Sequence, residues 1–320
     1  MRERGARGSG GADQGALTRP HCPATARRMT APAIAAGLAE LAPRYDALLC
    51  DVWGVIHNGR EAFPAACGAL ARFRETRGPV ILISNSPRPN GPVIDQLDGL
   101  GVPREAWSHI VTSGDATRLL LAARAPGPAW KVGPDRDDVL YEGLPVEFSD
   151  LADAAFISVT GPYDDENDEP ADYRDRFIAC VARDLELVCA NPDIVVQRGD
   201  KLIYCGGALA QLYESLGGRV TMAGKPFKTI YDLSLAKIDE AAQGENGDAP
   251  ANPARVLCIG DGLPTDIRGA NAQGLDVLFV ASGIHGGETI GPDGLNAPAV
   301  ADLLHQAGLT ATYAIADLVW

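Results

Sequence analysis

Short apolar runs that end on polar residues recur along this chain and alternate with segments of helical periodicity. From Met29 onward the runs predict strands at 46–50, 79–84, 109–114, 255–259 and 277–280. The intervening segments predict helices at 32–43, 65–76, around 119–121 and at 227–241. Strands that alternate with helices are typical of βαβ units. The pattern therefore predicts an α/β fold built on a parallel sheet.

The stretch from about 115 to 221 has strands and helices of its own. Its apolar runs predict strands at 130–133, 155–159, 187–190 and 202–204. The acidic stretch 164–169 is predicted to be a solvent-exposed loop with no part in a site, and the Gly/Asn/Pro-rich stretch 244–254 a mobile loop.

Asp51 ends the apolar run 48–50 and is followed at once by a turn at Gly54. This places its carboxylate at the C-terminal tip of a buried parallel strand, where open α/β sheets build their sites. Three later stretches supply polar groups in the same way: Ile-Ser-Asn-Ser at 83–86, Gly-Lys-Pro at 224–226, and the stretch 259–266 with Asp261 and Asp266. Each stretch alone is weak evidence, and the signal lies in the four together, in this order.

Asp51, Asp261 and Asp266 are predicted to converge at the strand ends. Carboxylates this close repel one another unless a cation lies between them, and hard oxygen ligands suit Mg²⁺. Lys225 adds a positive charge and Ser84 a hydroxyl donor, so the group can hold a phosphate. Asp51 is then placed for in-line attack and an aspartyl-phosphate intermediate, and the backbone carbonyl of Trp53 can also serve the metal.

Composition narrows the partners. The net charge of −14 argues against nucleic acid and anionic membranes, and no apolar run reaches the ~20 residues of a membrane span. Seven cysteines without a C-x-x-C pair indicate reduced cysteines and a cytoplasmic protein. Residues 1–28, rich in Arg, Gly and Ala, are predicted to be a disordered tail, an extension upstream of a start at Met29, or a transit peptide.

In these motifs the chain resembles the haloacid dehalogenase superfamily of phosphohydrolases. Ser84 and Lys225 are 141 positions apart, and the insertion that this spacing implies resembles the large α/β cap of class IIA, the group of nitrophenylphosphatase-like and sugar-nucleotide phosphatases. Further similar stretches are V-T-S-G-D-A-T at 111–117, N-P-D at 191–193, G-G-A-L at 206–209, A-G-K-P at 223–226 and S-G-I-H-G-G-E at 282–288.

The resemblance implies a Rossmann-like core at 29–114 and 222–320, with a cap at 115–221 inserted into it. It implies Asp51 as nucleophile, with Ser84 and Lys225 orienting the phosphate. It implies a Mg²⁺ site at Asp51, Asp261 and the Trp53 carbonyl, with Asp266 either as a further ligand or as a residue that supports the ligands. Residues expected in the substrate pocket are Asn85, Trp53, Asn191 and Asp193. The expected partner is a small phosphorylated metabolite, and a homodimer through the cap is expected by analogy.

Trp53 departs from the family pattern, in which an aspartate at this position protonates the leaving group. A general acid contributes about 10²–10⁴-fold, most for poor leaving groups. His57 is a candidate substitute or simply a loop histidine, and Trp53 either stacks on a substrate ring or fills space under the cap. Three functions stay open: a Mg²⁺-dependent phosphatase favouring good leaving groups, a phosphoryl-ligand binder without turnover, and a dehalogenase-type hydrolase.

Overall fold

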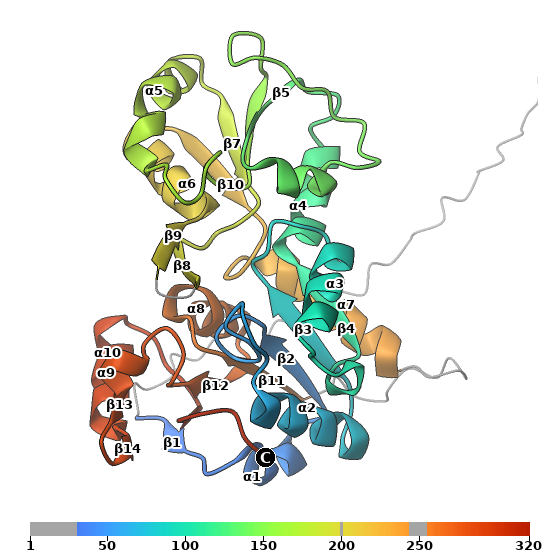
Figure 1. Ribbon diagram of the computed structural model, residues 1–320, viewed down its shortest axis with the longest axis vertical. Helices are drawn as coiled ribbons and strands as arrows, with labels where there is room; N and C mark the ends of the chain where they lie inside the picture. Colours follow the sequence, from blue (N-terminus) through green and yellow to red (C-terminus); the bar gives the residue numbers. More distant parts are fainter. Residues whose placement is uncertain (1–30, 199–200, 243–254) are drawn as a thin grey trace, which may run out of the picture.

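The computed structural model describes residues 31–198, 201–242 and 255–320. The predictions for 1–28 and for 244–254 lie outside these residues. Figure 1 shows two units stacked along the long axis, each built around its own sheet. In the described part of the chain, no helix is long and apolar enough to cross a membrane.

The larger sheet has seven strands in the order β1-β15-β12-β11-β2-β3-β4, and all its paired neighbours are parallel. The strands are β1 Ala33–Ile34, β15 Tyr313–Ile315, β12 Asp276–Val280, β11 Val256–Gly260, β2 Ala47–Asp51, β3 Val80–Ser84 and β4 His109–Thr112. Every residue of β2, β3 and β11 is buried, as expected for parallel strands covered on both faces. The predicted α/β fold with a parallel sheet is confirmed.

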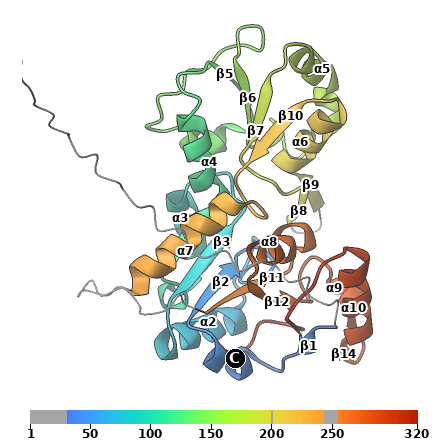
Figure 2. The same ribbon diagram turned by 180° about the vertical axis from the view of Figure 1, so that it is seen from behind.

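Helices cover both faces of this sheet. Helices α1 Leu38–Leu41, α2 Pro64–Thr76 and α3 Asn90–Gly99 pack on one face, against Leu48 and Leu82. Helices α7 Lys228–Ala242, α8 Arg268–Gln273 and α10 Ala297–Gln306 pack on the other, against Leu49 and Ile81, and Figure 2 shows α7 lying across it. Neighbouring residues of one strand face opposite layers because strand side chains alternate.

The smaller unit has a four-stranded parallel sheet in the order β10-β7-β6-β5. Its strands are β5 Ala129–Val132, β6 Phe156–Val159, β7 Glu186–Cys189 and β10 Arg219–Met222, with helices α5 Arg174–Ala182 and α6 Gly206–Ser215. An antiparallel hairpin, β8 Val195–Arg198 with β9 Lys201–Tyr204, lies between this unit and the larger sheet (Figure 1). Helix α4 Ser113–Ala122 contacts β4 and α7 of the larger unit and β7 of the smaller one.

Two local predictions are wrong. Residues 32–43 do not form one helix: Ala33 and Ile34 pair with β15, and α1 begins only at Leu38 and leads into a 3₁₀ turn, Ala42–Arg44. Residues that pair with β15 are extended and cannot be helical, and the backbone is still extended at Gly37, directly before α1. Strand β4 ends at Thr112, because Thr112 and Asp115 form a capping box that starts α4 at Ser113.

The hairpin strand β8 was not anticipated from the sequence. The six cysteines in the described part of the chain are all free and buried, which fits the prediction of reduced cysteines.

We propose that 115–221 is an inserted cap, although the limits predicted for it fall inside α4 and β10. Phe177 is fully buried in this unit, with its ring 6.2 Å from that of Trp130 and 5.2 Å from that of Tyr213. Phe177→Ala is expected to cost about 3–5 kcal/mol of unfolding free energy through the cavity it leaves. Hydrogen exchange should show lost protection in β6 and β7 and retained protection in β2.

The matched control is Phe148→Leu, because Phe148 is 47% exposed and should tolerate the change. Equal loss of protection in β2 and β7 of Phe177→Ala would show that the two units unfold together.

Candidate active site

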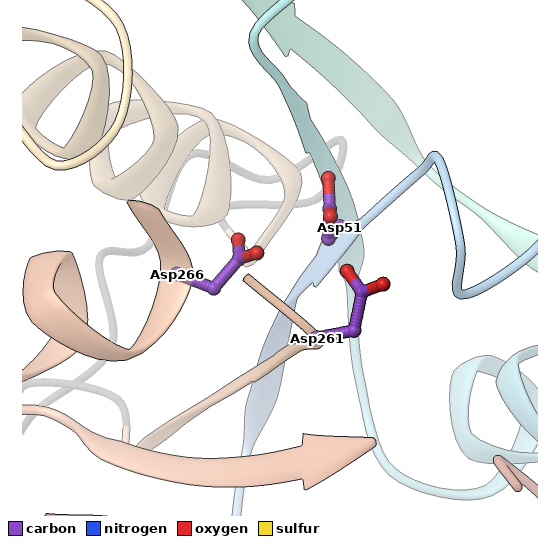
Figure 3. Close-up of side chains that lie close together, drawn as sticks. All are labelled: Asp51, Asp261 and Asp266. Atoms are coloured by element: carbon purple, nitrogen blue, oxygen red, sulfur yellow. The ribbon is translucent and has the colours of Figure 1, made fainter. Parts of the chain in front are cut away.

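The predicted catalytic groups lie together at the carboxyl ends of three neighbouring strands. Asp51 is the last residue of β2, Ser84 the last of β3, and Asp261 directly follows β11. Asp266 lies in the single π-helical turn Leu263–Ile267, which leads into α8. Figure 3 shows the three aspartate side chains turned toward one another. They line a cavity of about 1080 Å³ that is also lined by residues of the smaller unit.

The three carboxylates form a buried cluster. Each offers an oxygen within 4.8 Å of the others, and each residue is at most 7% exposed. Burial raises the pKa of Asp51 to about 6, and the charge of Asp261 adds to the effect. Burial also raises the pKa of Asp261 and of Asp266 to about 7, reinforced in Asp261 by Asp266 and in Asp266 by Asp51. The cluster thus concentrates carboxyl groups in a place that has too little positive charge to balance them.

Lys225 is the cation of this cluster and is 2% exposed. Its Nζ donates to Asp51 Oδ1 at 2.5 Å and to Asp266 Oδ1 at 2.8 Å. Burial alone would lower the lysine pKa, but the neighbouring carboxylates raise it above its usual value, so the ammonium stays charged. One ammonium against three ionised carboxylates leaves two negative charges, which a divalent cation would balance.

Backbone groups and glycines hold the carboxylates in place. Val52 N–H donates to Asp51 Oδ1 at 2.7 Å, and Ile284 N–H donates to Asp261 Oδ2 at 2.8 Å. A side chain at Gly54, where φ is +84°, or at Gly283 would collide with Asp261. The loops can therefore approach Asp261 only because these positions are glycine.

Asn85 links the two units through Lys225. Its Oδ1 accepts from the Lys225 backbone N–H at 2.7 Å, and its Nδ2 donates to the Lys225 carbonyl at 3.3 Å and to Asp193 Oδ1 at 2.8 Å. The predicted role of Asn85 was substrate binding, whereas these contacts position Lys225 and join the larger unit to the smaller one. Its contact with substrate stays a prediction.

The other residues predicted for the substrate pocket also line the cavity: Asn191, Asp193 and Trp53. Asn191 Oδ1 accepts from the Asp193 backbone N–H at 3.1 Å, and burial raises the pKa of Asp193. The Trp53 ring lies edge-on to that of His57, with centroids 5.1 Å apart. Burial lowers the pKa of His57 to about 4, which keeps its imidazole neutral near pH 7.

Sequence reasoning missed part of the lining. Arg88 lines the cavity from the loop after β3, and its Nη2 donates to Gln96 Oε1 at 2.6 Å. Arg136 and Asp165 line it from the smaller unit as an ion pair. The stretch 164–169 is therefore mainly exposed as predicted, but the expectation that it takes no part in a site needs correction at Asp165. No local pattern marks Arg136, because its place depends on the tertiary fold.

Comparison with known proteins agrees with this geometry. A family model described as haloacid dehalogenase-like hydrolase matches residues 48–144, and a second, HAD-hydrolase-like model matches 222–307. This chain is similar to the crystal structure of a haloacid dehalogenase-like hydrolase from Brucella suis 1330, with 41% sequence identity and a TM-score of 0.76. The match covers 88% of this chain and 99% of that chain. The chain belongs to the haloacid dehalogenase-like hydrolase family.

Curated relatives are phosphatases. D-glycerol 3-phosphate phosphatase of Mycobacterium tuberculosis is 28% identical over 253 residues, which cover 77% of this chain and 65% of that protein. Ribonucleotide monophosphatase NagD of Escherichia coli K12 is 26% identical over 244 residues, covering 74% of this chain and 88% of that protein. The resemblance to class IIA phosphatases and the classification as a phosphatase-like hydrolase are confirmed. The roles of the individual site residues stay predictions.

Removing the Asn85 side chain tests its link between the units. Asn85→Ala leaves the backbone N–H of Lys225 and the partly buried Asp193 carboxylate without their partner. We expect a loss of about 1–3 kcal/mol in the free energy of unfolding, measured by urea denaturation. Asn90→Ala, at an exposed position at the start of α3, is the control and should leave the midpoint unchanged. Equal midpoints for the two variants would contradict this role of Asn85.

Proposed function

We propose that this protein is a Mg²⁺-dependent phosphatase that hydrolyses a small phosphorylated metabolite through an aspartyl-phosphate on Asp51. One observation carries the proposal: the buried cluster of Asp51, Asp261 and Asp266 around Lys225, at the wall of a large cavity. Family membership and the phosphatase relatives support it.

The residues fit a magnesium ion. Three carboxylate oxygens within 4.8 Å of one another are hard ligands, and two negative charges lack compensation. Asp51, Asp261, Asp266 and the backbone carbonyl of Trp53 would hold the ion. When bound, it would neutralise charge on the phosphoryl oxygens and leave room for water and phosphate as further ligands.

Asp51 has one carboxylate oxygen engaged and one available. Oδ1 accepts from Val52 N–H and from Lys225, whereas Oδ2 accepts no hydrogen bond from the described residues. Oδ2 attacks phosphorus as the bond from phosphorus to the leaving oxygen breaks, and that oxygen keeps the electron pair. Water then attacks the phosphorus of the aspartyl-phosphate, which releases inorganic phosphate and the Asp51 carboxylate. Ser84 and Lys225 orient the phosphoryl group.

Trp53 restricts the leaving group. Its indole N–H is too weakly acidic to protonate a departing alkoxide, so the ~10²–10⁴-fold contribution of a general acid is missing. Neutral His57, with a pKa lowered to about 4, is a poor replacement. The proposed substrates are therefore phosphate compounds whose leaving group departs as a stable anion. Aryl phosphates (which release phenolates), acyl phosphates and phosphoanhydrides are of this kind.

Two other functions remain candidates. Trp53 favours a phosphoryl-ligand binder without turnover, because it removes the proton donor that phosphatases use. A dehalogenase-type hydrolase is favoured only by the same missing acid, and the retained acidic cluster speaks against it because that chemistry needs no Mg²⁺. The cytoplasmic location and the homodimer through the cap stay predictions.

Hydrolysis of p-nitrophenyl phosphate tests the proposal. Wild type with Mg²⁺ should turn this substrate over, and EDTA or Asp51→Asn should abolish turnover because the cation or the nucleophile is lost. Trp53→Asp should hydrolyse alkyl phosphates faster than wild type, by up to ~10²-fold, the smaller end of the range for general-acid catalysis. Turnover in Trp53→Asp alone would favour the binding protein, and turnover insensitive to EDTA would contradict the metal site.

The raised pKa values predict coupled effects of pH and Mg²⁺ on stability. Asp261 and Asp266 have pKa values of about 7 in the folded protein and ~3.9 in the unfolded chain. Their contribution to the free energy of unfolding is therefore full at low pH and is lost as the pH rises toward 7. Mg²⁺ should reverse that loss, raising the melting temperature strongly at pH 8 and little at pH 5. Differential scanning fluorimetry measures both.

Asp261→Asn is the control and should remove most of the Mg²⁺-dependent shift at pH 8. A Mg²⁺ shift of the same size at pH 5 and pH 8 would show that these carboxylates do not bind the ion.

A further inference from the structure

The wall of the cavity beside the nucleophile is aromatic. Trp53 lies two residues beyond Asp51, is partly buried, and lines the cavity together with His57. The two ring centroids are 5.1 Å apart, with an angle of 71° between the ring planes. A leaving group held near Asp51 therefore lies in the same cavity as this ring surface.

The surrounding loop is shaped to hold the Trp53 ring. Trp53 and His57 form a parallel bridge, and Gly54 N–H donates to the His57 carbonyl at 2.8 Å. Gly59 has φ of +84°, and a Cβ there would lie 2.5 Å from Cη2 of Trp53. Only glycine satisfies both conditions, so the ring occupies a space that this loop leaves for it.

The same loop sets the hydrogen-bonding state of His57. Gly59 N–H donates to His57 Nδ1 at 2.9 Å, which places the ring proton of the neutral imidazole on Nε2. Nε2 of His57 and Nε1 of Trp53 make no hydrogen bond to the described residues, and neither is among their fully buried unpartnered atoms. The partly buried Trp53 thus offers its indole N–H to the cavity, whereas His57, which is only 1% exposed, supports the Trp53 ring from within the loop.

Apolar groups extend this surface around the cavity. Side chains from the loops at the strand ends and from the β8–β9 hairpin contribute to the lining: Phe63, Val195, Ile203, Tyr204, Ile284 and Leu318. In the proposed function, Ser84, Lys225 and the cation hold the phosphoryl end of a substrate, so this apolar wall is available to the rest of the molecule. Polar side chains such as Arg88, Arg136 and Asp165 line other parts of the cavity, whereas a planar apolar group packs best against the apolar wall around Trp53.

We propose that Trp53, held in place by the buried His57, forms a subsite for a planar aromatic leaving group, so that the substrates are aryl phosphates. The inference rests on the proposed phosphatase function and narrows its substrate class. A phenolate departs with the electron pair of the broken phosphorus–oxygen bond and takes its proton from water, so it needs no acid at position 53. Trp53 therefore leaves the site without a general acid and at the same time supplies ring surface for a leaving group that needs no acid.

A pair of substrates with matched leaving-group acidity separates aromaticity from leaving ability. Phenyl phosphate and hexafluoroisopropyl phosphate release alcohols of similar acidity, and only phenol is aromatic. Wild type should favour phenyl phosphate in kcat/KM by roughly five- to tenfold, the size expected of one aromatic pair. Trp53→Leu should bring this ratio close to one, and Trp53→Phe should restore most of it. Phe148→Leu, at an exposed site that does not line the cavity, should leave the wild-type ratio unchanged.

Binding by Asp51→Asn gives a readout independent of turnover. Calorimetry with phenylphosphonate and cyclohexylphosphonate should show several-fold tighter binding of the phenyl compound, and the added Trp53→Leu change should remove the difference. A wild-type ratio near one, or a ratio unaltered in Trp53→Leu, would overturn the aromatic subsite and leave the phosphatase proposal intact. Absence of all turnover together with a phenyl preference in binding would overturn the phosphatase and support the subsite.

Discussion

Burial of three carboxylates around one ammonium is the constraint on which the rest of the site depends. Asp51 and Asp266 share Lys225, and burial with mutual repulsion raises the pKa of all three acids. Such an arrangement persists only if its surroundings hold each group in place. Backbone N–H donors and the absence of side chains at Gly54 and Gly283 provide that support. The remaining negative charge suits a divalent cation, as the proposed function requires.

The parallel sheet makes this concentration of charge possible. Strands β11, β2 and β3 are neighbours, and their carboxyl ends deliver Asp261, Asp51 and Ser84 to one edge. Lys225 comes from a different place, the segment that returns from the smaller unit, and Asn85 fixes its backbone from the end of β3. The placement of the ammonium is therefore coupled to the placement of the smaller unit, and Asp193 shares the same Asn85 side chain.

The sequence predicted the parts of this arrangement that follow local rules. A buried strand that ends on an acid places that acid at the sheet edge, so Asp51 and Asp261 could be located without coordinates. Tertiary contacts decided the rest. Pairing with β15 overrode the helical pattern at 32–43, and the bonds of Asn85 join residues more than 100 positions apart. The ring contact of Trp53 with His57 and Gly59 also depends on a loop conformation that no periodicity encodes.

That loop bears on how the substitution at position 53 should be understood. If Trp53 only marked a lost proton donor, the residues around it would have no reason to match its ring. Gly59 instead has a backbone conformation disfavoured for other residues and lies where any side chain would strike the indole, while its N–H holds the His57 ring. A glycine fitted to the ring on one side and a histidine orienting its own donor on the other indicate a loop built as a unit. Under the proposed function, the missing general acid and the aromatic surface would then be one change in specificity, from leaving groups that need a proton to leaving groups that need a binding surface.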